Sequence, residues 1–340
     1  MYRIKAQSML ASAAYALVED LQQYFVKQLE TFTRSEQTAF DAVEWFRDEG
    51  LHGGGVRYVA LDEQVFNRGS VNVSQVQYDD DGTKRLASAT ALSTIIHPKN
   101  PYAPSVHIHI SWTEMKNGKG YWRMMADLNP AIENRQATEL FDKTLKKAAP
   151  EQYQIAVAQG ERYFYIPALE RHRGVSHFYL EEYSNDNQQA DFDLARELGQ
   201  TVIDCYVSIF QQAIKDNPNL SEQSYKYQLA YHTLYLFQVL TLDRGTTSGL
   251  LVHNQNDIGI MGSLPAYVDK DLLSSWQDKL AFPQDELLAA IVDVLPDTTP
   301  CIIDEKVKAL LADVSRQHYK AYPGALALQA QGNIVPPTVQ

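Results

Sequence analysis

Apolar side chains recur at helical spacing in several parts of the chain. The segments that predict helices are residues 8 to 32, 136 to 147, the stretch from Asp191 as its N-cap to about 209, 269 to 280 and 284 to 294. In the first segment, Leu17, Leu21, Phe25 and Leu29 recur every four positions and would share one face. This spacing is typical of an amphipathic helix that covers a core.

Other segments have the composition and alternation of strands. The expected strands are residues 57 to 61, 71 to 78, 88 to 97 and 105 to 112, with turn-like DDDG and NPYAP sequences among them, and further strands over 231 to 242 and 258 to 264. Residues 231 to 242 are almost entirely apolar or aromatic, which favours a strand buried on both faces. The order of these elements predicts an α+β fold, with a large, mainly antiparallel β-sheet flanked by helices on both faces.

Composition and charge narrow the classes of function. The chain has 340 residues, and no Pro/Gly/Ser-rich linker divides it, so we expect one main domain. Its formal net charge of −12 repels nucleic acid and anionic lipid surfaces, so we do not expect nucleic acid as a partner. An anionic substrate would therefore need a local group of Arg, Lys or His side chains.

Cysteine usage and the N-terminal sequence suggest a reduced compartment. Cys205 and Cys301 lie far apart and form no CxxC pair, which argues against a zinc site or a disulfide framework. The first apolar run reaches Glu19 and Asp20 before it is long enough to span a bilayer. We expect a cytoplasmic protein without membrane insertion.

A run of three glycines interrupts the chain at Gly53, Gly54 and Gly55. Glycine tolerates positive φ and close approach of another backbone. The run lacks the spacing and the Lys-Ser/Thr of a phosphate-binding loop, so a nucleotide site is not expected here.

The segment from Ser93 to Trp112 has the clearest chemical content. Strand side chains alternate between the two faces, so His107, His109 and Ser111 would share one face, opposite Val106, Ile108, Ile110 and Trp112. Pairing of the two strands around the turn would add Ser93 and His97 to the polar row. Such a row either faces solvent or lines a site.

Histidines in such a row have several possible uses. Histidine transfers protons near neutral pH, binds metals as neutral imidazole, or donates to a carboxylate when it is charged. His97 and His107 are the candidate metal ligands, with His109 and either His177 or His253 completing a multi-histidine site.

A resemblance to a known family rests on an ordered series of motifs from about residue 38 to 295. The segment with Ser93, HPKNPYAP and His107 resembles the signature of the oxygen-dependent coproporphyrinogen oxidases. The EGLHGGGVR, RYFYIP, HRGVSHFYLEEY and LDRGTTSGL sequences are similar to further family motifs in the same order. Residues 1–296 would then form a single coproporphyrinogen oxidase-like domain, and residues 297–340 a partly flexible C-terminal extension whose last part, from 325, is loosely held.

The resemblance implies a reaction and roles for individual residues. Family members use dioxygen as co-substrate to convert two propionates of coproporphyrinogen III into vinyl groups, in porphyrin and heme biosynthesis. They need no organic cofactor, and a divalent metal is not required. By resemblance His107 would transfer protons, Asp243 would hold pyrrole N–H groups, and Arg244 would support Asp243 electrostatically. The resemblance also implies a homodimer. Without the resemblance, Asp243-Arg244 at a strand end is most simply a structural ion pair.

The sequence departs from the family pattern where the substrate would bind. The family usually has H-x-N-x-R after the catalytic histidine, whereas this chain has His109 and Ser111 in the last two motif positions. A Gly-Gly-Arg of the family is replaced by His253-Asn254-Gln255, and Phe237 and Val239 replace Glu and Asn. The candidate substrate-binding residues are therefore Ser93, His109, Ser111, His253, Asn254 and Gln255.

These departures leave alternatives open. Arginine holds a carboxylate through a permanently charged fork that His and Ser cannot reproduce. Compensating cations could come from Arg123, Arg171, His172 or Arg173. The alternative functions are oxidation of another tetrapyrrole, tetrapyrrole binding without turnover, and an oxygen-using enzyme with a histidine-bound metal.

Overall fold

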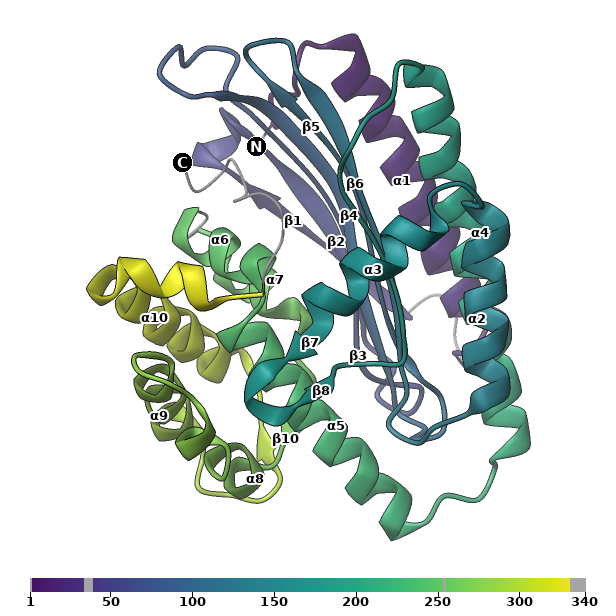
Figure 1. Ribbon diagram of the computed structural model, residues 1–340, viewed down its shortest axis with the longest axis vertical. Helices are drawn as coiled ribbons and strands as arrows, with labels where there is room; N and C mark the ends of the chain where they lie inside the picture. Colours follow the sequence, from purple (N-terminus) through teal and green to yellow (C-terminus); the bar gives the residue numbers. More distant parts are fainter. Residues whose placement is uncertain (1, 34–38, 253–254, 331–340) are drawn as a thin grey trace.

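The computed structural model describes residues 2–33, 39–252 and 255–330. An antiparallel sheet of seven strands runs through the middle of this part of the chain, in the order β1-β2-β3-β4-β5-β6-β9 (Figure 1). Its strands are β1 (Phe40–Phe46), β2 (Gly53–Ala60), β3 (Phe66–Gln77), β4 (Leu86–Pro98), β5 (Ser105–Met115), β6 (Gly120–Asn129) and β9 (Ser176–Tyr183). The predicted α+β class with a large antiparallel sheet is confirmed.

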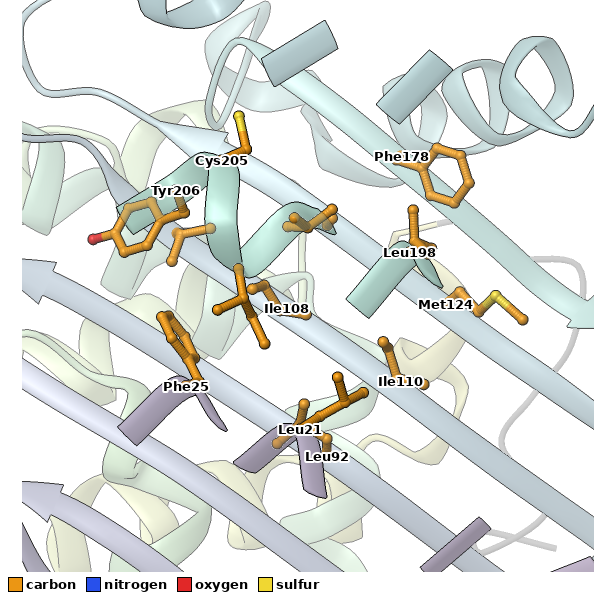
Figure 2. Close-up of a cluster of buried hydrophobic side chains, with 14 of the residues drawn as sticks. Leu21, Phe25, Leu92, Ile108, Ile110, Met124, Phe178, Leu198, Cys205 and Tyr206 are labelled. Atoms are coloured by element: carbon orange, nitrogen blue, oxygen red, sulfur yellow. The ribbon is translucent and has the colours of Figure 1, made fainter. Parts of the chain in front are cut away.

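Three helices cover one face of the sheet. They are α1 (Met9–Glu30), α2 (Arg135–Ala148) and α4 (Gln188–Asp216), which lie together on one side in Figure 1. The apolar stripe predicted for α1 is fully buried and meets strand side chains such as Ile108 and Ile110 (Figure 2). Within the described residues, no helix is both long enough and apolar enough to span a bilayer.

The opposite face of the sheet carries α3 (Tyr153–Phe164) and the elements that follow α4. Its elements are α3, α5 (Glu222–Thr241), α6 (Arg244–Val252), α7 (Asp257–Ile260), α8 (Lys270–Ser274), α9 (Gln284–Val294) and α10 (Glu305–Ala321), with the short pairs β7 (Tyr165–Ile166) and β8 (Arg171–His172), and β10 (Tyr267–Val268) and β11 (Cys301–Ile302). A second apolar core joins α5 and the helices after it to Ile95, Met125 and Tyr179 of the sheet. The sheet is therefore covered on both faces, as expected.

Most of the local predictions agree with the structure. The four strands expected between residues 57 and 112 correspond to β2, β3, β4 and β5, and the helices expected over 8 to 32, 136 to 147 and 284 to 294 correspond to α1, α2 and α9. Strands β1, β6 and β9 and helices α3 and α10 were not among the predictions. The helix near 269 to 280 is shorter, because α8 ends at Ser274 and a single 3-10 turn, Gln277–Lys279, follows.

The strand predicted over 231 to 242 was wrong, because these residues form the last part of helix α5. Every residue from Tyr231 to Thr241 is buried. A helix that is buried on all sides shows no polar stripe, so its sequence resembles that of a buried strand. The helix begins earlier, in the polar stretch after Ser221, whose side chain accepts from Ser224 N at its N-terminus.

Two further local predictions need correction. Residues 258 to 264 are not a strand, since they contain α7 and the 3-10 turn Met261–Ser263. The N-cap of α4 is Asn187, whose side chain accepts from Ala190 N, and Asp191 lies inside the first turn. Asp191 instead accepts from Asn185 N, which fixes the loop before the helix.

The glycine run adopts the backbone that was expected of it. Gly53 and Gly54, at the start of β2, have φ of +93° and +143°. A Cβ on Gly53 would lie 2.2 Å from the carbonyl oxygen of Gln75 on β3. These glycines therefore allow β1, β2 and β3 to pack closely beside the N-terminal segment.

Residues after 296 contribute to the second core. β11 pairs with β10, and α10 contacts α6 and α9. The segment from 325, which was expected to be loosely held, is packed as far as Ala330, and Gln329 Nε2 donates to Tyr319 Oη at 2.9 Å. Residues 331–340 lie outside the described part of the chain. The domain division at residue 296 stays a prediction.

Candidate active site

A cavity of about 320 Å³ lies between the sheet and helices α5, α6 and α7. Its floor is the polar row of β3, β4, β5 and β6, and its other wall includes residues of α3 and the α5–α6 junction. Small-molecule sites are concave spaces of this kind, with a few convergent polar groups among apolar side chains.

The pairing of β4 with β5 forms the polar row that the sequence predicted. Ser93 lies directly opposite His109, and the side chains of Ser93, His107, His109 and Ser111 all line the cavity. Their neighbours Val106, Ile108, Ile110 and Trp112 belong to the core on the other face. The row therefore borders a cavity and does not cover a solvated face.

His97 shares this strand face but lies outside the cavity. It is fully buried against α5, where its ring contacts those of His232 and Tyr235. Its Nδ1 pairs with Ser105 Oγ at 2.8 Å and its Nε2 with the carbonyl of Ser263 at 3.1 Å. Burial and the neighbouring His232 lower the pKa of His97 well below its usual value. It joins the sheet to α5.

His107 belongs to a buried charged network that sequence analysis did not find. Its Nδ1 lies 3.0 Å from Asp127 Oδ1, and the other oxygen of Asp127 accepts from Arg173 at 2.6 Å and from Asn129 at 2.6 Å. Asp127 is directly opposite His107 in the β5–β6 ladder and is completely buried. Burial alone would raise the pKa of Asp127, but Arg173 and His107 outweigh it and lower the pKa to about 2.

This network sets the tautomer of His107. Because Asp127 is ionised and can only accept, the His107 Nδ1 must carry the hydrogen that joins them. Nε2 is then left to exchange a proton with a group bound in the cavity. The geometry is that of a histidine base oriented by a carboxylate.

Asp243 lies at the junction between α5 and α6, not at the end of a strand. Its Oδ1 accepts from the backbone N–H of Thr246 at 2.7 Å, an N-cap arrangement, and its Oδ2 accepts from the hydroxyl of Tyr163 at 3.0 Å. Asp243 and Tyr163 both line the cavity. Two oxygens have about four lone-pair positions, so the carboxylate can accept further hydrogen bonds from a ligand.

The other predicted site residues are placed less favourably. Arg244, the first residue of α6, is half-buried and does not line the cavity, so its supporting role stays a prediction. Gln255 is exposed outside the cavity and accepts from the backbone of Asp48. As a substrate ligand it is therefore not supported by this arrangement. His253 and Asn254 lie outside the described residues.

Two of the four proposed compensating cations reach the cavity. Arg123 and Arg173 line it, whereas Arg171 is exposed and His172 faces Glu161. Tyr163 and Tyr179, which also line the cavity, were missed. Strand alternation could have indicated Asp127 and Arg123, since both lie an even number of residues from Met125 on β6, but β6 itself was not predicted.

The metal hypothesis finds no support in this geometry. Among residues 2–33, 39–252 and 255–330, no three His, Cys, Asp or Glu side chains are grouped as metal ligands would be. His177 is engaged at both ring nitrogens, by Glu161 and by the carbonyl of Arg173. His97 and His107 as metal ligands remain an untested prediction.

Comparison with known proteins places these residues in a family. Residues 13–286 match the family model for coproporphyrinogen III oxidase. The mitochondrial oxygen-dependent coproporphyrinogen-III oxidase of Rattus norvegicus is 27% identical over 281 residues, which are 75% of this chain and 61% of that protein.

Two other relatives are also named oxygen-dependent coproporphyrinogen-III oxidases. The Drosophila melanogaster protein is 27% identical over 275 residues, 74% of this chain and 69% of its own length. The Prochlorococcus marinus (strain MIT 9313) protein is 25% identical over 321 residues, 83% of this chain and 88% of its own. The match to the rat protein covers less than two thirds of that protein's length. The family match includes the cavity, the His107–Asp127 pair and Asp243, and the chain belongs to the coproporphyrinogen III oxidase family.

Proposed function

We propose that this protein is an oxygen-dependent oxidase that converts propionate side chains of a reduced tetrapyrrole into vinyl groups, with coproporphyrinogen III as the substrate and heme biosynthesis as the setting. The observation that carries the proposal is that one cavity contains both the Asp243 carboxylate and an oriented histidine, His107. The family match and the names of the relatives support the same reaction.

The proposed reaction balances without an organic cofactor. For each propionate, the C–H bond beside the ring breaks and passes a hydride equivalent to dioxygen. The electron pair of the bond to the carboxylate becomes the vinyl double bond, and carbon dioxide leaves. One proton from solvent completes hydrogen peroxide.

The residues of the cavity would divide this chemistry between them. Asp243 would accept pyrrole N–H groups, which positions the macrocycle and raises its electron density. His107 would move a proton through Nε2 while Asp127 holds its ring through Nδ1. Tyr163 would keep the Asp243 carboxylate turned toward the ligand.

The test is direct. Purified protein is incubated with coproporphyrinogen III in air, and the products are oxidised to porphyrins and separated by chromatography with fluorescence detection. Vinyl-bearing products, with matching oxygen uptake, are expected. If an authentic oxidase forms product under the same conditions and this protein forms none, the assignment of substrate is wrong.

A second candidate is the same chemistry on a different carboxylated tetrapyrrole. It is favoured by the polar row, where His109 Nε2 and Ser111 Oγ share a hydrogen bond of 3.0 Å in place of the motif arginine. Burial and the nearby Arg123 lower the pKa of His109 well below its usual value, so the ring is neutral and brings no charge. Parallel incubations with tetrapyrroles of different carboxylate number would separate the two candidates, and porphyrin binding without oxygen uptake would instead indicate a binding protein.

Three further expectations belong to this proposal. We infer that dioxygen is the co-substrate without an organic cofactor, that the protein forms a homodimer, and that it acts in the cytoplasm. Oxygen-dependent activity of exhaustively dialysed protein, sedimentation of the purified protein and cell fractionation test them in turn.

A further inference from the structure

Two arginines line the cavity, and their surroundings differ. Arg173 is almost completely buried, forms an ion pair with Asp127 at 2.6 Å, and lies against the rings of Phe164 and Tyr235. Its charge is already balanced by the network that orients His107. Arg123, on β6, belongs to no such pair among the described residues.

The guanidinium of Arg123 has no hydrogen-bond or ion-pair partner among the residues that the structure describes. No ion pair in that part of the chain involves it, and its Nε is buried without a hydrogen bond. A buried N–H without an acceptor costs free energy, and a buried cation costs more unless an anion is near. In a native protein such a group usually meets an ordered water, an ion or a bound ligand, and Arg123 lines the cavity where a ligand would lie.

The described groups around Arg123 do not supply an anion within ion-pair distance. Ser111 lies directly opposite it in the β5–β6 ladder, and His109 beside it is neutral. Glu181, whose charge acts on Arg123 through space, accepts from the hydroxyl of Tyr179. Burial lowers the pKa of Arg123, but the opposing effect of Tyr179, Glu181 and Tyr163 is larger, and the pKa lies above its usual value. The side chain is therefore charged at any working pH.

We propose that Arg123 is the carboxylate anchor of the cavity and binds a propionate-type carboxylate of the ligand through its guanidinium fork. This inference deepens the proposed function, on which it rests for the identity of the ligand, by assigning a subsite to one residue. Ser111 lies directly opposite Arg123 in the β5–β6 ladder and lines the same cavity, so the polar surface continues beside the guanidinium.

The position of Arg123 offers a charge-transposition test. Directly opposed residues of an antiparallel pair have Cβ atoms about 5 Å apart on the same face. Moving the guanidinium from 123 to 111 therefore keeps it on the same wall of the cavity. Four proteins are compared: wild type, Arg123→Met, the double variant Ser111→Arg with Arg123→Ser, and Arg135→Met, which removes an exposed arginine of α2 far from the cavity.

The first measurement is binding of coproporphyrin III, which is stable in air, by quenching of its fluorescence. Arg123→Met is expected to weaken binding about 10-fold or more, because a charge-assisted hydrogen bond is lost. The transposed variant should recover at least half of that loss on a logarithmic scale, and Arg135→Met should bind as wild type does. Equal affinity of wild type and Arg123→Met would overturn the proposal, as would equal loss in the transposed variant with no recovery.

The second measurement does not depend on a tetrapyrrole. The side-chain Nε–H resonance of Arg123, assigned by its absence in Arg123→Lys, is followed by NMR while sodium propionate is added, with sodium chloride as the ionic control. A saturable shift with propionate alone is expected, and an unmoved resonance refutes the anchor. Absence of vinyl product in the turnover assay leaves this result unaffected, so failure of the proposed reaction and failure of the anchor are distinguishable.

Discussion

Asp127 keeps its negative charge in the interior because three donors converge on its two oxygens. His107, Arg173 and Asn129 all reach it, and the pKa of Asp127 falls to about 2 although burial opposes this. The carboxylate of Asp127 thus neutralises Arg173 and orients His107, and both of these side chains line the cavity. Asp127 is a positioning residue that acts through His107.

Asp127→Asn is predicted to separate these two effects. Removal of one partner leaves Arg173 buried without a counter-charge, and the free energy of unfolding should fall by about 3 kcal/mol or more. Formation of vinyl product should fall about 100-fold or more, because the His107 tautomer is no longer fixed. Urea unfolding and the turnover assay measure the two quantities.

The control is Asp193→Asn, an exposed aspartate of α4 that should change neither. The double variant with His107→Gln adds a stricter criterion. If Asp127 works through His107, the double variant is no less active than His107→Gln alone. Additive losses of activity would show an independent role for Asp127.

The proposed anchor, Arg123, lies directly opposite Ser111 in the β5–β6 ladder. Ser111 occupies the position that has an arginine in the motif that this sequence resembles. Sequence alone named Arg123 only as one of several compensating cations. Its selection required the register of β5 with β6.

At the scale of elements, α5 closes the cavity and buries several titratable side chains against the sheet. His232 of α5 meets His97 of β4 with ring centroids 5.1 Å apart. Burial lowers the pKa of His232 to about 3, and it also lowers the pKa of His97 and of His109 well below the usual value. All three are neutral in the folded protein.

These histidines predict a loss of stability in mild acid. Between pH of about 6.5 and about 3 the unfolded chain binds protons that the folded chain does not, so the free energy of unfolding falls as the pH falls. Each such histidine contributes a slope of about 1.4 kcal/mol per pH unit. Urea unfolding at several pH values between about 7 and about 4 measures the total slope.

His232→Gln isolates the contribution of one histidine. Glutamine does not titrate, so the slope of unfolding free energy against pH should decrease by about 1.4 kcal/mol per pH unit. This change does not depend on the absolute stability of the variant. An unchanged slope would mean that His232 is protonated in the folded state, contrary to its environment.

The start of β2 provides a matched pair of glycines. Gly53→Ala places a Cβ against the carbonyl of Gln75 at a φ of +93°, and should destabilise the protein by about 2 kcal/mol or more. Gly82→Ala, in an open turn with no atom within 4 Å, is the control and should have little effect. Thermal unfolding of both variants tests the close packing of β2 on β3, and equal melting temperatures would argue against it.

At the scale of the whole molecule, one sheet separates two cores. The first core lies under α1, α2 and α4 and supports the strands (Figure 2). The second core, around α5 and α10, lies on the other face of the sheet beside the cavity. Gln329 reaches Thr247 of α6 at 2.5 Å, so the last described residues contact the helix that follows Asp243.

The contribution of helix α10 to the second core can be tested with two neighbouring leucines. Leu311 is fully buried, whereas Leu310 is 38% exposed. Leu311→Ala is expected to lower the free energy of unfolding by about 2 to 5 kcal/mol, and Leu310→Ala by well under that amount. Equal effects in urea unfolding would show that α10 is not part of the cooperative core.

Local periodicity alone determined much of the molecule. The alternation of His107, His109 and Ser111 with apolar residues follows from the two-residue repeat of a strand, and the stripe of α1 follows from the helical repeat. Both repeats depend only on nearby residues. The α+β class, four of the strands and the polar row could therefore be predicted from the amino-acid sequence by itself.

Only the tertiary structure decided the rest, because it depends on residues that are distant in the sequence. Burial on every side hid the helical character of α5, and with it the true setting of Asp243 between two helices. The register of β6 brought Asp127 to His107 and Arg123 to Ser111, and a later loop brought Arg173 to Asp127. Which charges are paired and which remain available to a ligand is a property of these long-range contacts.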